Sequence, residues 1–254
     1  APGYRADLLV FANLEDWHPV MVFKDGQLAA ENGKSLFMNF FVDDKGVRNT
    51  LNLGELNREK LRLPACSPIA RVIGLVPHQL VTIALELPMP VIQGEFVPDT
   101  SRDIMKMVVW ERHKGSGKVG VGLLQGLGLK QGAIASTIAH DSHNLVVVGT
   151  DDEAIMLAVK EIEHIQGGLV IAGEGKILGT LSLPLAGLMT DQDIGEVQEK
   201  LAELHKIARN LGVKEEYDPF MTLAFLSLPV IPALKLTDEG LVDVATFQLV
   251  SVSV

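Results

Sequence analysis

A small-residue apolar segment runs directly into five polar residues at positions 130–144 of the chain, KQGAIASTIAHDSHN. Such a polar group is costly to bury without partners and unusual to expose beside an apolar run. Its side chains offer two imidazoles, a carboxylate, a hydroxyl and an amide: His140, Asp141, Ser142, His143 and Asn144. These groups suit metal ligation, acid–base chemistry or recognition of a polar ring.

Three interpretations of this polar group are open. On a helix, His140 and His143 would share one face and could bind a metal, but a site needs three or four ligands, so His113 and Glu111 would have to lie nearby. The residues could instead form a hydrogen-bonded structural turn. We favour a third interpretation, in which they line or cap a substrate pocket; we expect them on a turn that faces a cleft rather than the core.

A second polar group, Glu111, Arg112 and His113, follows a predicted strand at residues 104–110. Functional side chains often follow strands, although a surface salt-bridge cluster fits the same pattern. Gly126, Gly128 and Gly132 have the wrong spacing for a dinucleotide or phosphate loop, and close backbone approach explains them better.

Composition narrows the class of protein. The chain has 254 residues, 47% of them hydrophobic, which is enough for a sizeable core. Its net charge of −10 argues against nucleic acid and anionic membranes as partners. Cys66 is the only cysteine, so an intramolecular disulfide and a Cys-rich metal site are excluded. A single cysteine is typical of a reducing compartment, so we expect a cytoplasmic protein. The sequence also has no apolar run long enough for a membrane helix and no signal-peptide pattern.

Local patterns predict an α+β fold: a mixed β-sheet with packed helices, preceded by a β-hairpin segment of a small β-sandwich. The hairpin signal is Asp25-Gly26 between apolar runs, since a tight turn there needs positive φ. Three helices are predicted. The first begins at a capping box at residues 150–153 and ends before the stop at 167–168, the second covers residues 193–211, and the third begins at Asp218-Pro219. A short helix is predicted at 55–61 and an extended loop at 88–102. Further strands are predicted at residues 81–87, 169–171, 177–183 and 241–254.

Several segments, in order, resemble the C-terminal region of bacterial adenine deaminases, and the resemblance covers essentially the whole chain. They are the stretch 130–144 with its flanks 120–122 and 146–149, the acidic-Arg-His group 111–113, LPLAGLM at 183–189, DPFMTL at 218–223 and LPVIP at 228–232. Residues 2–8 and 24–26 resemble the closing stretch of amidohydrolase-superfamily enzymes. The resemblance implies two domains: residues 1–55 as the last strands of the amidohydrolase small β-sandwich, and residues 56–254 as the adenine deaminase C-terminal domain.

The resemblance also implies an activity and its apparatus. Enzymes of this family hydrolyse adenine to hypoxanthine and ammonia with a metal-activated hydroxide, and the divalent metal, manganese or iron, sits in an N-terminal barrel. This chain has no His-x-His pair of the kind that holds such metals. We therefore expect no catalytic residue, metal ligand or cofactor in the chain itself, and expect the barrel of the same protein and adenine as partners.

Three functions follow as hypotheses. The chain could close or shape the active site of an adenine deaminase, serve only its assembly, or belong to a related enzyme acting on another cyclic amidine or amide. We also expect a homo-oligomer, an independent core from about residue 80 onward, and loosely held β structure in residues 1–35 whose unpaired edges promote association.

Overall fold

The computed structural model describes residues 1–37 and 42–254, which fall into two compact units, Ala1–Asp43 and Asp44–Val254. The larger unit combines a mixed eight-stranded sheet with three helices, so the predicted α+β class is confirmed. The assignment of domains to 1–55 and 56–254 stays a prediction. Part of its first segment, residues 38–41, lies outside the described residues.

The smaller unit is a four-stranded antiparallel sheet in the order β1-β2-β3-β4. Its strands are β1 (Leu8–Phe11), β2 (Pro19–Lys24), β3 (Gln27–Glu31) and β4 (Lys34–Ser35). Asp25 and Gly26 have φ of 50° and 79°, so the predicted tight turn between β2 and β3 is confirmed. Among the described residues of this unit only Ala29 is buried, so the sheet has almost no core of its own.

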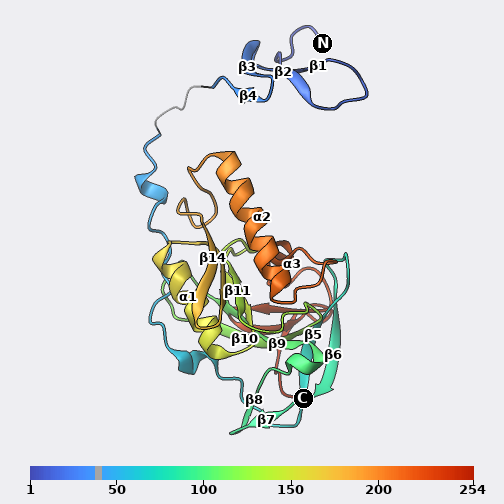
Figure 1. Ribbon diagram of the computed structural model, residues 1–254. Coiled ribbons are helices and arrows are strands. Elements are labelled where there is room, and N and C mark those ends of the chain that lie inside the picture. Colours follow the sequence, from blue (N-terminus) through green and yellow to red (C-terminus); the bar gives the residue numbers. More distant parts are fainter. Residues whose placement is uncertain (38–41) are drawn as a thin grey trace. The chain divides into compact units, whose positions relative to one another are not determined.

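The larger unit contains the eight-stranded sheet, in the order β14-β13-β11-β12-β9-β10-β5-β6 (Figure 1). Its strands are β5 (Ile69–Leu75), β6 (Thr82–Pro88), β9 (Ile104–Trp110), β10 (Val119–Gln125), β11 (Ala133–Ser136), β12 (Leu145–Gly149), β13 (Gly168–Gly173) and β14 (Lys176–Ser182). The β5–β10 pair is parallel, and the other neighbouring strands are antiparallel.

Both faces of this sheet are covered, which explains why central strand β9 is buried along its whole length. Alternate residues of a strand point to opposite faces. Met107 accordingly joins the core shared with helices α2 (Ile194–Asn210) and α3 (Pro219–Leu226), while Val108 joins the core shared with α1 (Asp152–His164). A small antiparallel sheet also packs on the α2–α3 side, formed by β15 (Leu234–Thr237), β16 (Gly240–Asp243) and β17 (Gln248–Val250).

The three helices lie where the sequence predicts them. They are α1 (Asp152–His164), α2 (Ile194–Asn210) and α3 (Pro219–Leu226). The N-cap of α1 is Asp151, whose carboxylate accepts from the Ala154 backbone N–H, rather than the Thr150 expected from the capping box. Asp218 caps α3 and Pro219 occupies its first turn, as predicted.

Four expectations about local structure or the core need correction. The helix predicted at 55–61 is only a 3-10 turn, Arg58–Leu61. The predicted loop at 88–102 contains a small hairpin, β7 (Val91–Ile92) with β8 (Glu95–Phe96), and a 3-10 turn, Thr100–Arg102. The single strand predicted at residues 241–254 is in fact two strands, β16 and β17, because a turn separates them. The compact core begins well before residue 80, since Leu53, Leu61 and Ile73 are all buried in it.

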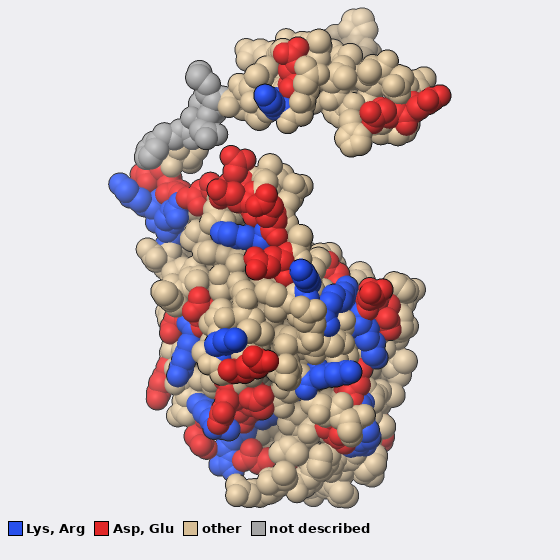
Figure 2. Space-filling view, viewed as in Figure 1, with Lys and Arg blue, Asp and Glu red and all other residues tan. Residues whose placement is uncertain are grey.

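Charges of both signs are interspersed over the face of the larger unit drawn in Figure 2. This face offers no continuous basic stripe of the kind that tracks a phosphate backbone. None of the helices in the described part of the chain has the length and apolar character needed to cross a membrane.

Candidate functional site

The polar residues 140–144 form a turn between β11 and β12, rather than a helix. The His143 backbone N–H donates to the Ala139 carbonyl at 2.6 Å, which closes the turn. The His140 N–H donates to the Ala224 carbonyl in α3 at 2.8 Å, and the Ser227 hydroxyl donates to the His140 carbonyl at 3.4 Å. The turn is therefore held against the end of α3.

Strand pairing brings the second polar group to this turn. β9 pairs with β12 so that Trp110 lies opposite Leu145, which places the residues after β9 beside those before β12. Arg112 Nε donates to the carbonyl of His143, and His113 Nε2 lies 2.7 Å from the carbonyl of Ser142. Two groups some 30 positions apart in the sequence thus form one cluster.

Arg112 is the central cation of this cluster and is only 1% exposed. Its Nη2 donates to the Ala186 carbonyl at 3.1 Å, so the guanidinium joins the 140–144 turn to the loop after β14. Gly187, with φ of 70°, allows this approach, because a Cβ there would lie 2.6 Å from Arg112 Nη1. Within the described residues no carboxylate lies within 4.0 Å of the guanidinium, and burial lowers the pKa of Arg112 to about 10. Arg112 therefore stays charged at neutral pH.

Glu111 points away from that cation into its own loop. Its carboxylate accepts from the backbone N–H groups of His113, Lys114 and Ser116 and from the Ser116 hydroxyl, at 2.6–3.1 Å. Burial acts to raise the pKa of Glu111, but these hydrogen bonds outweigh it and lower the pKa to about 2. In this structure Glu111 holds the 113–116 loop together.

The side chains of the turn divide by exposure. Asp141 and Ser142 are exposed, and His140 and His143 are half-buried. The expectation that all these polar residues face a cleft is wrong for Asn144, which is buried and donates from Nδ2 to Asp238 Oδ1 at 2.9 Å. The β15–β16 turn, which contains Asp238, covers this amide.

Two polar atoms of the turn are buried without a hydrogen-bond partner: His143 Nδ1 and Asn144 Oδ1. The pKa of His143 is lowered, first by burial and then by the nearby Arg112 charge and the imidazoles of His140 and His113. The ring is therefore neutral at pH 7 and can offer one donor and one acceptor. The His140 ring lies 6.2 Å from that of His143 and 4.7 Å from that of Phe225, between centroids.

The cluster does not provide a metal site. Across residues 1–37 and 42–254, no three His, Cys, Asp or Glu side chains lie close enough together to hold an ion. The Glu111 carboxylate, one of the additional ligands considered, is occupied by its own loop. The described residues of the cluster therefore do not form the set of three or four ligands that a divalent metal requires.

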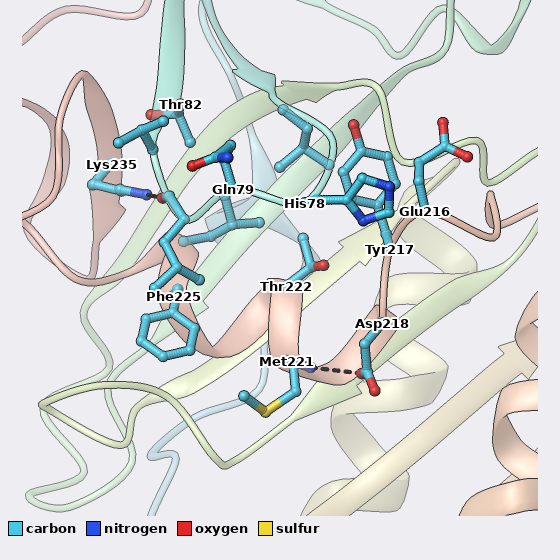
Figure 3. A pocket seen from close by; sticks show the side chains of 14 residues that line it. His78, Gln79, Thr82, Glu216, Tyr217, Asp218, Met221, Thr222, Phe225 and Lys235 are labelled. Atoms are coloured by element: carbon cyan, nitrogen blue, oxygen red, sulfur yellow. Dashed lines mark hydrogen bonds between the residues drawn. The ribbon is translucent and has the colours of Figure 1, made fainter.

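A separate pocket lies between the β5–β6 connection, the start of α3 and β15 (Figure 3). Its cavity volume is about 150 Å³, and none of the eight predicted site residues lines it. Its buried lysine, Lys235, was not predicted from the sequence. In the sequence Lys235 stands between two apolar residues, Leu234 and Leu236. Such alternation in a strand usually indicates that the charged side chain faces solvent, so the pattern does not indicate that Lys235 is buried.

Comparison with known proteins gives one consistent family. The adenine deaminase C-terminal domain family matches residues 79–248. Adenine deaminase 2 of Carboxydothermus hydrogenoformans is 63% identical over 253 residues, covering 100% of this chain and 44% of the relative. An adenine deaminase of Dehalococcoides mccartyi is 45% identical over 98% of this chain, and one of Nitratidesulfovibrio vulgaris 44% identical over 100% of it. The chain spans less than half the length of each, 44%. It belongs to the adenine deaminase C-terminal domain family.

Proposed function

We propose that this chain is the C-terminal part of an adenine deaminase, which hydrolyses adenine to hypoxanthine and ammonia. The family match and the names of the relatives support this proposal. The hydrolytic chemistry belongs to an N-terminal barrel with a divalent metal, manganese or iron, that activates water. The contribution of this chain is to close or shape the active site with the 140–144 turn.

The observation that carries this role is the half-buried imidazole of His143, on a turn whose main chain is held by Arg112. Leaving a desolvated polar group without its hydrogen-bond partner costs about 1–3 kcal/mol, so a side chain that pairs with substrate contributes on that scale. Adenine carries ring nitrogens and an amino group along its edge, so a neutral imidazole suits it as donor or acceptor. Exposed Asp141 and Ser142 lie on the same turn and extend the polar surface available to substrate.

The cluster divides this work between two kinds of residue. His140, Asp141, Ser142 and His143 are the substrate-facing candidates. Arg112 positions them by fixing the main chain of the turn, while His113 and Asn144 contact or support it from either side, and Glu111 fixes the adjoining loop. No group in the cluster needs to act as a nucleophile.

A second candidate function is assembly. Leu8 and Leu9 in the smaller unit are 56% and 58% exposed, on a strand at the edge of its sheet. Exposed apolar edge strands favour association with further strands or subunits. This observation supports docking against the rest of the same protein and a homo-oligomer as further parts of the proposal. The location we propose is the cytoplasm, on the ground that the sequence contains a single cysteine.

The test is substrate profiling of the longer protein that contains this chain. Ammonia release is measured from adenine, guanine and cytosine, and ring opening is measured for a cyclic amide such as dihydrouracil, whose hydrolysis gives a ureido acid and no ammonia. We expect adenine to give the highest kcat/KM by at least two orders of magnitude. Preference for a cyclic amide, or for another amidine, would replace adenine deamination with the related-enzyme hypothesis.

A further inference from the structure

The pocket in Figure 3 is a formed cavity that the proposed function does not use. The Thr82 hydroxyl donates to the Leu234 carbonyl at 2.8 Å, and its backbone N–H donates to the Pro232 carbonyl at 2.9 Å, so the β5–β6 connection is fixed to the start of β15. Asp218 Oδ1 accepts from two N–H groups in the first turn of α3, at 3.0 and 2.9 Å, which fixes that helix end. A pocket formed in advance loses little free energy to ordering when it binds a ligand.

The wall of this pocket is mostly apolar and aromatic. The residues that form this part of the wall are Leu80, Val81, Tyr217, Met221, Phe225 and Leu226. Leu80, Val81 and Met221 are 48%, 39% and 55% exposed, so their apolar surface is open to a ligand. Two aromatic side chains in the wall favour a ligand that is itself a flat aromatic ring, because such rings stack or meet edge to face.

The charges around the pocket favour a ligand without net charge. Glu216 and Asp218 line the rim (Figure 3), so they repel an anion. Lys235 lies in the wall, but it is 0% exposed and its Nζ donates to the Leu80 carbonyl, so it offers no group to a ligand. Its buried charge nevertheless disfavours a second cation inside the cavity.

The rim contains one carboxylate that is free to accept a hydrogen bond. Asp218 caps α3 and its Oδ2 lies 3.4 Å from His205 Nε2, so this carboxylate is already engaged. Glu216 lines the pocket and, in the described part of the chain, takes part in no side-chain hydrogen bond and in no ion pair within 4.0 Å. Tyr217 is 6% exposed, and burial raises its pKa, so the phenol keeps its proton at neutral pH and stays a donor. The pocket therefore suits a ring with an N–H donor for Glu216.

We propose that this pocket binds an uncharged heteroaromatic ring that carries an amino group, with the ring against the apolar wall and the amino group directed at Glu216. A cavity of about 150 Å³ accommodates a six-membered ring, and a fused second ring would extend through the open side. A carboxylate accepts from an amino group, whereas a carbonyl at the same position leaves it without a donor. The site should therefore reject the oxo counterpart of such a ring.

Adenine and cytosine both contain a ring of this kind, so they are the two sources of the ligand to be distinguished. None of residues 140–144 lines the pocket. The inference therefore goes beyond the proposed function, because it places a second site apart from the turn that we expect to face substrate.

The test is calorimetric titration of the 254-residue chain at pH 7 with adenine and hypoxanthine, and with cytosine and uracil, each base beside its deaminated counterpart. We expect saturable binding of adenine or cytosine, and binding of the counterpart weaker by about tenfold or more. The tighter of the two amino bases identifies the source as a purine or a pyrimidine. Benzoate, an anion of similar size, should also bind about tenfold more weakly or worse.

Three variants locate the bound ring. Glu216→Gln should weaken binding of the amino base about tenfold and reduce its preference over the oxo base, because an amide offers both a donor and an acceptor. Thr222→Phe, which fills the cavity, should weaken binding about tenfold or more. Glu203→Gln, the same substitution as the first at an exposed position of α2, should leave affinity unchanged.

The proposal is overturned if neither amino base binds saturably, if amino and oxo bases bind equally, or if Thr222→Phe keeps wild-type affinity. Binding that is lost in His143→Ala but kept in Thr222→Phe would place the ring at the 140–144 turn, which overturns this inference and leaves the proposed function intact. If Thr222→Phe fails to fold, Glu216→Gln and the preference for the amino base still decide. Failure of the proposed function would appear separately, in the substrate profile of the longer protein.

Discussion

Replacing Arg112 by lysine should loosen the 140–144 turn while keeping its positive charge. The guanidinium spans two carbonyls, those of His143 and Ala186, from different loops. A lysine has one ammonium nitrogen in place of the forked guanidinium, so it reaches at most one of these carbonyls. The other carbonyl then loses its hydrogen bond, at a cost of about 2 kcal/mol. For a domain of this size that cost lowers Tm by about 4–8 °C.

The assay is thermal unfolding of Arg112→Lys beside Arg58→Lys, the same change at an exposed arginine with only distant ion pairs. The control should change Tm by less than about 2 °C. In the full-length enzyme Arg112→Lys should also lower kcat/KM for adenine, because a loosened turn positions its side chains less well. Unchanged Tm and unchanged kinetics in Arg112→Lys would refute the argument that this guanidinium holds the turn.

Three further predictions concern other parts of the chain. The folded-state pKa of Glu111 is about 2, below its usual 4.5, so the stability that this carboxylate contributes should be complete above about pH 4.5 and disappear as the pH falls toward 2. The Tm difference between wild type and Glu111→Gln, measured across pH 2–7, should follow that course. A Tm difference that stays constant with pH would contradict the prediction. The 254-residue chain alone should release no ammonia from adenine and retain no stoichiometric metal after chelation; either activity or tightly bound metal would show that the chain carries its own centre. Residues 6–30 should exchange their amide hydrogens quickly, and the chain should associate as its concentration rises, because β1 is an exposed edge strand. Strong protection of these amides, together with a monomer at all concentrations, would contradict this prediction.

Local signals were sufficient to predict the elements with strong end signals. Asp25-Gly26, Asp218-Pro219 and the stop at residues 167–168 each constrain the backbone directly, and the hairpin and helices appear where they indicate. Elements without such signals were missed or misjudged. β5 carries no periodic pattern because most of it is buried, and the predicted strand at 241–254 concealed a turn, where Phe247 adopts φ of 56°.

The candidate site was predictable only in part, for a topological reason. The sequence indicated residues 111–113 and 140–144 separately, but their meeting depends on the pairing of β9 with β12, which neither segment encodes alone. The burial of Arg112 depends on Gly187, a contact between distant loops. Lys235 could not be identified because its burial comes from packing of the β5–β6 connection over β15.

The most direct test of the central claim is the kinetics of His143→Ala and Asp141→Asn in the full-length enzyme, with His164→Ala as the control at an exposed histidine. If the 140–144 turn faces substrate, kcat/KM for adenine should fall about tenfold or more in both variants, with Tm within about 2 °C of wild type and the control unchanged. Wild-type kinetics together with a Tm lowered by several degrees would show that the turn is structural and does not shape the active site.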